Sequence, residues 1–412
     1  MSAGLEQLAA ALGPESVFVH EALAVEGAQL EASLRPSSGE ALAVTLRLLS
    51  EHGLSALVRG AGTRIATANA PCRARVLLET QGLSEAALID AEEGVARFAA
   101  GARLESLREA LAGSGWELPL DPPGDASTLG GTLAAAAQGP RFGSPRDVVL
   151  GLGVVLASGE RIRCGGRVVK NVTGYDLAKL FVGSFGTLGV IEWAWLRLRP
   201  APEATHTCVA ALEPGVAGDA AALVAARLPT VRAAAVADAA LLPDALAVAS
   251  RVLIVELAGD AAAIDRDAEA LSSRYGAVPT EPAALEALRT AQGAGPLRVR
   301  VAALPSALPA AAEVLRSGGA LVLAYPARGL LWARFRLSGP EDERSAERAL
   351  RAATLAARAA GGSYLLEAAP LAARQGREVF AGAASTLALE RAVKHQYDPA
   401  GILNPGRFVG GL

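Results

Sequence analysis

The chain has 412 residues, of which 51% are hydrophobic and 20% are charged, and its formal net charge is −3. A chain of this length is expected to form two or three domains with buried cores. The nearly balanced charge offers no basic surface of the kind that nucleic acids require, so we expect no nucleic-acid partner.

Cysteine usage and the N-terminus narrow the class of protein further. Cys72, Cys164 and Cys208 are scattered without a C-x-x-C pair, so the sequence predicts no metal site and no iron–sulfur cluster in this chain. The chain begins MSAGLEQLAAALG without a basic segment, and no apolar run reaches the roughly 18 residues of a membrane span. We expect a cytoplasmic protein without a transmembrane segment, and a peripheral association with the inner membrane through partners stays open.

Helices and short strands alternate in the first part of the chain, which indicates an α/β or α+β fold. Ser38 is a candidate helix cap and Gly53 a candidate helix end. Apolar spacing predicts helices over residues 4–12, 38–53 and 103–111, and strands over residues 55–60, 75–78, 87–91 and 95–99.

Glycine and small residues dominate the next part. A stiff turn at residues 119–124 precedes a small-residue helix that begins after Ser127. Residues 146–164 are typical of a hairpin around residues 157–159. Thr173 and Asp176 then have the spacing of a capping box, before a short amphipathic helix and a strand.

The strand-like pattern of the sequence is interrupted at Pro200 and Pro202, which mark a linker. Two rounds of strand, helix and strand follow over residues 204–367, and this order predicts a ferredoxin-like α+β domain on an antiparallel sheet. The final piece from residue 389 is too short to fold alone, so we expect it to pack back on an earlier domain.

Three glycine-rich places could hold a ligand. Residues 59–64 follow a strand, and successive N–H groups in such a loop can hold an anion, although a plain βα turn would have the same sequence. Residues 127–131 open a helix with hydroxyls and glycines, which suits an anion or, equally, close helix packing. Neither place carries a Walker loop or a complete G-x-G-x-x-G pattern.

The third place is the run KNVTGYDLAKLFVGSFGTLGVIE, where Gly183, Gly186 and Gly189 follow one another at steps of three. Such glycines mark a bulge or a close approach of backbone to a ligand. Nearby, Arg141, Ser144 and Arg146 lie in a turn that a solvated loop explains as well. Several glycine-rich loops without a catalytic triad favour an extended cofactor that contains phosphate.

The motifs VRGAGT, DPPGDASTLGG, GPRFGSPRDVVLGLGVVLASGE, GGRVVKNVTGYDLAKLFVGSFGTLGVI and HQYDPAGILNPGR occur in one order. In this the chain resembles FAD-linked oxidases of the vanillyl-alcohol oxidase/p-cresol methylhydroxylase type, and among them the FAD-binding subunits of bacterial glycolate oxidase complexes. The resemblance implies an α+β fold with a two-subdomain FAD-binding domain, a ferredoxin-like cap and a C-terminal segment that returns to the FAD domain. The implied boundaries are a helical segment at 1–35, the FAD domain at 36–202, the cap at 203–370 and the returning segment at 371–412.

The resemblance also implies which residues bind FAD. The first loop would surround the diphosphate, the second and Ser144 would follow the diphosphate and ribityl chain, Val190 and Ile191 would contact adenine, and Asn404 would approach the flavin ring. That loop lacks the histidine that tethers FAD in many relatives, so the cofactor is expected to be non-covalent. The candidate FAD-binding residues are Arg59, Gly60, Ala61, Gly62, Thr63, Arg64, Pro123, Thr128, Leu129, Gly130, Gly131, Ser144, Gly183, Gly189, Val190, Ile191 and Asn404.

No catalytic residue can be assigned from the sequence. Catalytic relatives carry an H-x-G-D-G-N run, and the four histidines here, His20, His52, His206 and His395, are far apart. Tyr364, Glu367 and His395 are candidates for the cap or the flavin face. A structural role for His395 and a strand-ending role for Glu367 are the alternatives. Lys170 and Tyr175 are expected to position the flavin loop.

The resemblance supports three functional hypotheses. The first is an FAD-dependent oxidoreductase subunit of a complex that oxidises a 2-hydroxy acid, glycolate to glyoxylate. Its partners would be a catalytic FAD-linked hydroxy-acid oxidase subunit and an iron–sulfur subunit. The second is a free-standing oxidase or dehydrogenase of a small hydroxy acid, which a convergent cluster of Arg, His or Tyr at the flavin face would favour. The third is a non-catalytic scaffold with a vestigial flavin site.

Overall fold

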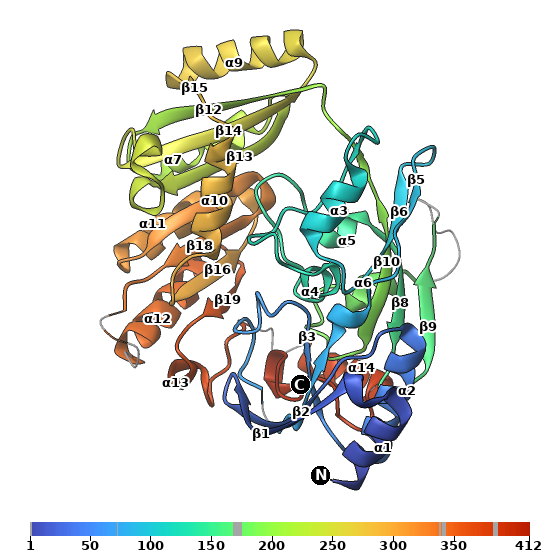
Figure 1. The fold of residues 1–412 in the computed structure, drawn as a ribbon. Helices are drawn as coiled ribbons and strands as arrows, with labels where there is room; N and C mark the ends of the chain where they lie inside the picture. The colour runs from blue at the N-terminus through green and yellow to red at the C-terminus, as the bar shows by residue number, and fades with distance from the viewer. Residues whose placement is uncertain (1, 72, 168–174, 338, 340–342, 382–385) are drawn as a thin grey trace.

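The computed structural model describes residues 2–71, 73–167, 175–337, 339, 343–381 and 386–412. The candidate residues Lys170 and Thr173, and Cys72, lie outside the described residues. Within the described ranges, no helix is both long enough and apolar enough to cross a membrane. Figure 1 shows the chain as two bodies side by side, with the C-terminus beside the first body.

The first body begins with a four-stranded sheet in the order β1-β2-β4-β3. Strands β1 and β2 form an antiparallel hairpin, and β2, β4 and β3 are parallel. Ser38 caps α2 by accepting from Ala41 N at 3.1 Å, as predicted, and the leucines of α2 pack on the sheet. The elements are α1 Ala3–Leu12, β1 Val17–Val25, β2 Ala28–Leu34, α2 Gly39–Glu51, β3 Ala56–Arg59 and β4 Val76–Glu79.

The hairpin of β1 and β2 corrects one expectation. Residues 1–35 were expected to be helical, and only Ala3–Leu12 form an α-helix there. In β2 the buried side chains Leu30, Ala32 and Leu34 alternate at a period of two, which is the pattern of a strand with one buried face. The short apolar spacing of the preceding helix does not continue through these residues.

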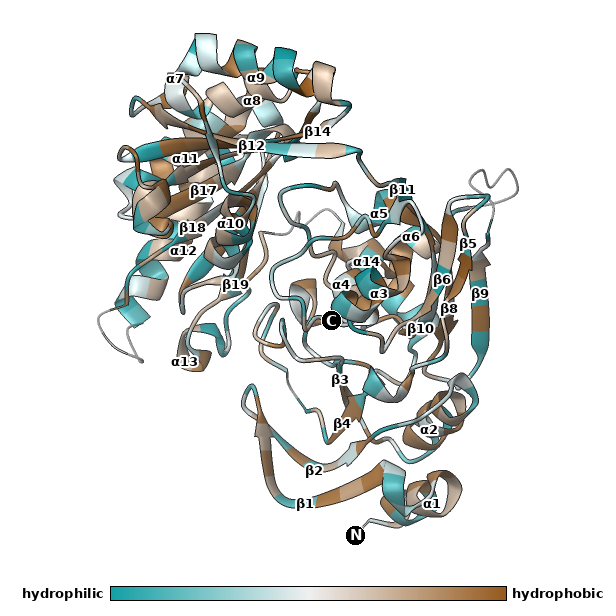
Figure 2. Ribbon diagram, turned by 45° about the horizontal axis from the view of Figure 1, so that its top comes forward, coloured by the Kyte–Doolittle hydropathy of each residue, from teal (hydrophilic) through white to brown (hydrophobic). Residues whose placement is uncertain are grey.

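A five-stranded antiparallel sheet in the order β5-β6-β10-β8-β9 completes the first body. The predicted hairpin is confirmed as β8 and β9. In Figure 2 strands β6 and β8 are largely hydrophobic, and α3, α4 and α6 pack on this sheet. The elements are β5 Leu88–Asp90, β6 Val95–Ala99, α3 Leu104–Leu111, β7 Trp116–Glu117, α4 Leu129–Ala134, α5 Pro145–Val148, β8 Val149–Val155, β9 Arg161–Gly165, α6 Ala178–Phe181, β10 Val190–Arg197 and β11 Arg199–Pro200.

The second body is built on one eight-stranded sheet, in the order β15-β12-β14-β13-β17-β18-β16-β19. This order contains two βαββαβ units, each with the strand arrangement of a ferredoxin-like fold, joined where β13 meets β17. The predicted ferredoxin-like fold is confirmed and is present twice. The elements are β12 Ala204–Leu212, α7 Val216–Asp219, α8 Ala221–Ala225, β13 Val231–Asp238, β14 Arg251–Gly259, α9 Ala261–Tyr275, β15 Val278–Thr280, α10 Ala283–Gly293, β16 Arg298–Ala302, α11 Leu308–Ser317, β17 Leu321–Tyr325, β18 Leu330–Arg334, α12 Glu343–Ala359 and β19 Ser363–Ala368.

The two faces of this sheet have different neighbours. Helices α11 and α12 cover the outer face of the second unit, where they bury Val299 and Val301 of β16. Helix α10 packs on the opposite face, against Trp332 and Tyr325. Since side chains alternate along a strand, Arg298 and Arg300 of β16 lie on this inner face, which is directed toward the first body.

Ion pairs hold the inner face to the first body. Glu256 of β14 is 2% exposed and accepts from Arg141 of the first body at 3.0 Å and from Arg232 of β13 at 2.6 Å. Arg232 in turn pairs with Glu117 of β7 at 2.9 Å. Arg141, predicted to lie in a ligand-binding or solvated turn, therefore fastens the two bodies together.

The C-terminal segment, with α13 Leu371–Arg374 and α14 Leu387–Tyr397, returns to the first body as expected. Leu403 forms a parallel bridge with Ala56 of β3. The partly buried Lys394 donates to Thr187 O at 2.7 Å, to Leu403 O at 2.9 Å and to Asp398 Oδ2 at 2.6 Å. This contact fixes the segment that carries Asn404.

Candidate functional site

The first glycine loop follows β3 and touches the start of α4. A Cβ atom on Gly60 would overlap the hydroxyl oxygen of Thr128, so only glycine allows the two segments to approach this closely. Gly62 adopts a φ of +78°, which is also favourable for glycine. The same Thr128 hydroxyl caps α4 by accepting from Gly131 N at 3.3 Å. Two of the three predicted glycine-rich places are therefore in direct contact.

Arg64 lies at the end of this loop and donates only to neutral oxygens. Its guanidinium contacts Ser127 Oγ at 2.9 Å, Pro123 O at 2.8 Å and Thr63 Oγ1 at 3.3 Å. Desolvation lowers the pKa of Arg64 to about 10, although the nearby Glu367 opposes this shift. The group remains a cation at neutral pH, with no carboxylate at ion-pair distance among the residues described.

Arg407 is a second cation at the same loop. Its side chain is 4% exposed and donates to the carbonyl oxygens of Ile65 at 2.9 Å, Thr67 at 2.8 Å and Asn69 at 3.0 Å. Burial lowers the pKa of Arg407 to about 10. The C-terminal segment thus fixes the shape of the loop and adds positive charge beside it.

Asn404 joins the first glycine loop to the third. Its Oδ1 accepts from Val58 N at 2.7 Å, and its Nδ2 donates to Phe185 O at 2.6 Å. A Cβ atom on Gly186 would lie 2.8 Å from Asn404 Nδ2, so glycine is needed for this approach. All three predicted glycine-rich places therefore converge, although they are far apart in the sequence.

A groove runs through this convergence, and we call it the cradle. Thirteen of the seventeen candidate FAD-binding residues line its two adjoining cavities. Arg407 and Phe185 line it as well and were not predicted. The candidates that line it are Arg59, Gly60, Ala61, Gly62, Thr63, Arg64, Thr128, Gly130, Gly131, Gly189, Val190, Ile191 and Asn404.

Four candidates lie elsewhere. The Leu129 side chain is buried in the core of the five-stranded sheet. Ser144 caps α5 by accepting from Arg146 N at 3.3 Å, and Gly183 donates from its N–H to Leu133 O at 3.0 Å. Leu129, Ser144 and Gly183 line neither cavity of the cradle. FAD binding by these three residues stays a prediction, and their positions do not support it. Pro123 lines a neighbouring cavity instead.

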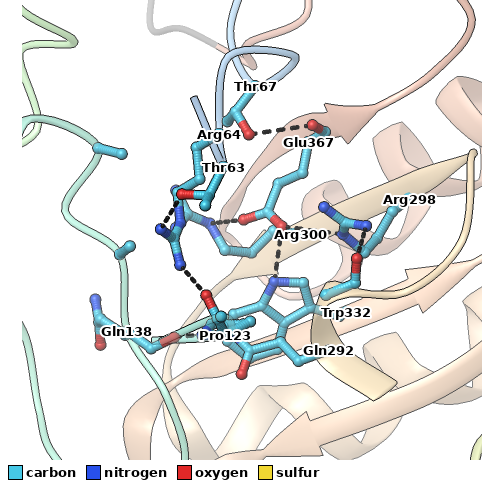
Figure 3. Close-up of a pocket in the computed structure, with 14 residues that line it drawn as sticks. Thr63, Arg64, Thr67, Pro123, Gln138, Gln292, Arg298, Arg300, Trp332 and Glu367 are labelled. Carbon is cyan, nitrogen blue, oxygen red and sulfur yellow. Dashed lines mark hydrogen bonds and ion pairs between the residues drawn. The ribbon is translucent and has the colours of Figure 1, made fainter. Parts of the chain in front are cut away.

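That neighbouring cavity has a volume of about 200 Å³ and lies between the first body and the inner face of the second. We call it the cap cavity. Figure 3 shows Arg64 and Thr63 of the first loop on one side and Arg298, Arg300, Trp332 and Glu367 of the eight-stranded sheet on the other. Thr63 and Arg64 line both the cap cavity and the cradle, so the two spaces are adjacent.

Glu367 organises the cap side of this cavity. Its Oε2 accepts from Trp332 Nε1 at 3.0 Å and from Arg298 Nε at 3.3 Å, while its Oε1 lies 3.5 Å from Arg300 Nε. The sequence offered Glu367 either a place at the flavin face or the end of a strand. Glu367 is in β19, which ends at Ala368, so the strand-ending description is confirmed. Its side chain lines the cap cavity, and a place at the flavin face stays a prediction.

The other candidates do not enter the cap cavity. Tyr364 packs against the core under α12, and His395 is exposed on α14. Tyr175 is 92% exposed. Arg146 donates to Val182 O at 2.8 Å, which is a structural contact.

Part of the chain matches a known domain family. Residues 30–165 match the family model of the FAD binding domain. The chain therefore contains an FAD binding domain, which confirms FAD as the cofactor. Its fold is that of p-cresol methylhydroxylase, whose substrate-bound crystal structure superposes with a TM-score of 0.74 at 17% identity, over 98% of this chain and 96% of that chain. The predicted fold class is thereby confirmed.

Two curated relatives are similar over parts of the chain. The glycolate oxidase subunit GlcD of Bacillus subtilis is 33% identical over 221 residues, which are 50% of this chain and 47% of that protein. The glycolate oxidase subunit GlcE of Escherichia coli is 41% identical over 121 residues, which are 28% of this chain and 35% of that protein. Each match spans less than half the length of the relative.

The cradle fits the cofactor that the family implies. A diphosphate carries two negative charges, and Arg64 and Arg407 are two cations whose donors reach only neutral oxygens in the described structure. The glycines at positions 60 and 62 keep side chains out of the groove between them. Charge and shape thus both suit a dinucleotide.

Sequence reasoning missed Arg298, Arg300 and Trp332. The signal for the arginines was the alternation Arg-Val-Arg-Val over residues 298–301, which predicts a strand with one charged face. It does not indicate what that face meets. Arg407 stood within the quoted motif NPGR and was not considered.

Proposed function

We propose that this chain is an FAD-dependent oxidoreductase, the FAD-binding subunit of a multi-subunit dehydrogenase that oxidises a 2-hydroxy acid, glycolate to glyoxylate. The observation that carries the proposal is that the cradle and the cap cavity are adjacent and share the lining residues Thr63 and Arg64. A cofactor in the first space would lie next to a small polar ligand in the second. The similarity to two glycolate oxidase subunits supports the substrate class.

In this proposal residues 36–202 and 371–412 form the flavin part and residues 203–370 form the cap. The loop from Arg59 to Arg64 would hold the diphosphate, Val190 and Ile191 would lie along adenine, and Asn404 would lie near the flavin ring. FAD would be held without a covalent bond, since the first loop contains no histidine. When bound, FAD supplies the electron-pair acceptor of the reaction.

The residues of the chain would bind and orient rather than transfer protons. Arg64 and Arg407 offset the negative charge of the diphosphate. Glu367 is a poor candidate for a general base because both of its oxygens face cationic or N–H donors. Its role is to orient Arg298 and Arg300.

The cap cavity favours a second candidate, a chain that oxidises the hydroxy acid without a partner. Three arginines, Arg64, Arg298 and Arg300, line the cavity, and such a cluster is what an autonomous substrate site needs. In the first candidate, a catalytic flavoprotein subunit and an iron–sulfur subunit would share or receive the electrons. A scaffold with an empty flavin site is the remaining alternative.

One purification distinguishes these candidates. The full chain is purified alone, and its visible absorbance shows whether a flavin copurifies and is released by acid. Glycolate is then added without oxygen, first to the chain alone and then to the chain with its candidate partner subunits. Bleaching of the flavin in the chain alone supports autonomous oxidation, and bleaching only with partners supports the subunit. A chain that cannot take up FAD is a scaffold, and the proposal fails.

A further inference from the structure

The cap cavity contains more positive than negative charge. Arg64, Arg298 and Arg300 line it together with one acidic residue, Glu367. The three guanidinium groups exceed the carboxylate by two positive charges. Arg298 and Arg300 each act to lower the pKa of Arg64, which reflects repulsion among these cations. A cavity of this composition is stabilised by a bound anion.

Two of these arginines already donate hydrogen bonds from two of their three nitrogen atoms. Arg64 donates to Ser127, Pro123 and Thr63, as described above. Arg298 donates from Nε to Glu367 and from Nη1 to Gly293 O at 2.7 Å and Gly295 O at 3.3 Å. Their contacts fix both guanidinium groups to the walls of the cavity.

Arg300 differs from them. Its side chain is 21% exposed, and its one ionic partner among the described residues is Glu367, 3.5 Å from Nε. Within that part of the chain no hydrogen bond reaches its two terminal amino groups. A guanidinium group binds a carboxylate through parallel N–H donors of this kind. Arg300 thus has free donors inside a cavity with unbalanced positive charge.

The neighbours of Arg300 hold it in a fixed direction. Glu367 holds its Nε, and Trp332 holds Glu367 by a hydrogen bond of 3.0 Å. Trp332 and Arg300 are also directly opposite each other in the antiparallel pair of β16 and β18. The guanidinium is therefore pre-oriented before a ligand arrives, which reduces the entropy that binding would otherwise lose.

We propose that Arg300 binds the carboxylate of a small organic acid anion in the cap cavity, next to the cradle. The cavity volume of about 200 Å³ suits a ligand of a few heavy atoms. This inference rests on the proposed function, because the anion would be the hydroxy acid presented to the flavin. It adds the residue that selects the acid over a neutral alcohol or amide.

The test measures binding of oxalate, a small carboxylate that has no C–H bond to oxidise, to the full chain. Isothermal titration calorimetry is performed on the FAD-loaded and the flavin-free protein, with wild type, Arg300→Met, Arg300→Lys and Arg336→Ala. Arg336 follows β18 and is exposed outside the cavity. Arg336→Ala is therefore the control that also removes one positive charge. Circular dichroism verifies that each variant is folded.

Arg300→Met is expected to raise the Kd of oxalate by roughly 10- to 100-fold, the loss expected for a charge-assisted pair. Arg300→Lys should raise the Kd of oxalate by less, because lysine keeps the positive charge although it lacks the parallel N–H donors. Arg336→Ala should bind as the wild type does. Equal binding by Arg300→Met and the wild type, or no binding by the wild type, overturns the proposal.

The flavin measurement separates this result from the proposed function. FAD content unchanged in Arg300→Met, together with weak oxalate binding, supports both proposals. FAD content intact with unchanged oxalate binding removes Arg300 as the anchor and leaves the oxidoreductase standing. A wild-type chain that takes up no FAD defeats the proposed function, while the titration of the flavin-free chain still decides whether Arg300 binds a carboxylate.

Discussion

The side-chain amide of Asn404 donates a hydrogen bond of 2.6 Å to the carbonyl oxygen of Phe185, 219 residues earlier in the chain. Both residues have a left-handed backbone, with φ of +46° at Asn404 and +53° at Phe185. Such conformations persist only where surrounding contacts enforce them. The bond therefore links two unusual turns that both line the cradle.

Replacing Asn404 with Ala is expected to weaken both stability and FAD binding. Val58 N would lose its acceptor, a loss of about 1–3 kcal/mol, and Ala at this positive φ adds about 1–2 kcal/mol. Asn404→Gly tolerates the backbone and loses only the hydrogen bonds, so it should be intermediate. Urea unfolding and FAD titration measure the two effects. Wild-type stability in Asn404→Ala would contradict this reading.

Gly60→Ala is expected to abolish FAD retention, since its Cβ atom would push the first loop away from Thr128. Gly166→Ala is the matched control, because a Cβ there has no neighbour within 4 Å. Adding Thr128→Ala to Gly60→Ala removes the obstructing hydroxyl and should restore part of the flavin content. Flavin absorbance per mole of purified chain is the measurement. If the double variant holds no more flavin than the single one, contact with Thr128 is not the cause.

Acid is expected to loosen the attachment of the second body through Glu256. Burial raises the pKa of this carboxyl, but hydrogen bonds from Arg232 and Arg141 outweigh burial, so the pKa is below its ordinary value of 4.5. A depressed folded pKa contributes stability above about 4.5 that is lost as the pH falls through the folded value. Melting temperatures of wild type and Glu256→Gln should therefore differ most at neutral pH and converge in acid.

At neutral pH, the free energy of unfolding of Glu256→Gln is expected to be lower than that of the wild type by on the order of 3–5 kcal/mol, the usual effect of breaking a buried pair. Glu105→Gln is a suitable control, since Glu105 is exposed on α3 and its loss removes one carboxylate away from this contact. A gap between wild type and Glu256→Gln that stays constant from neutral to acid pH would argue against a titrating contact at Glu256.

Lys394→Met is expected to release the C-terminal segment. The ammonium group satisfies two carbonyl oxygens and the buried Asp398, and burial lowers the pKa of Lys394. Loss of one partner of such a pair costs about 3–5 kcal/mol. Limited proteolysis should then cut near the C-terminus, and FAD affinity should fall with the displacement of Asn404. Arg391→Met, exposed on the same helix, should change neither.

Local sequence patterns predicted most of the helices and strands. The cap at Ser38, the helix that follows Ser127 and Thr128, and the order of elements over residues 204–367 depend on neighbours in the sequence, so they could be predicted. The hairpin of β1 and β2 was missed because its mixed polar and apolar residues carry only a weak alternation. The doubling of the ferredoxin-like unit was missed because strand order depends on long-range pairing.

The candidate site was predictable where it consists of backbone. Glycines at 60, 62, 130, 131 and 189 indicate close approach wherever the partner is, and they line the cradle. The cap cavity depends on side chains that meet from distant elements, such as Arg64 of the first loop and Arg300 of β16. A single arginine in a strand gives no sign of the cation that it will face.

The narrow contact between β13 and β17 has a consequence for how this protein can vary. Only Val236 with Ala324 and Ala237 with Leu323 are in register across that seam. One half of the cap contains Glu256, which binds Arg141 of the flavin body. The other half contains the residues that line the cap cavity, Arg298, Arg300, Trp332 and Glu367. Both repeats contact the flavin body, the first through Glu256 and the second through Arg328, which donates to Arg141 O. Substitutions at Arg298 or Arg300 would therefore change ligand recognition and leave both of these attachments in place.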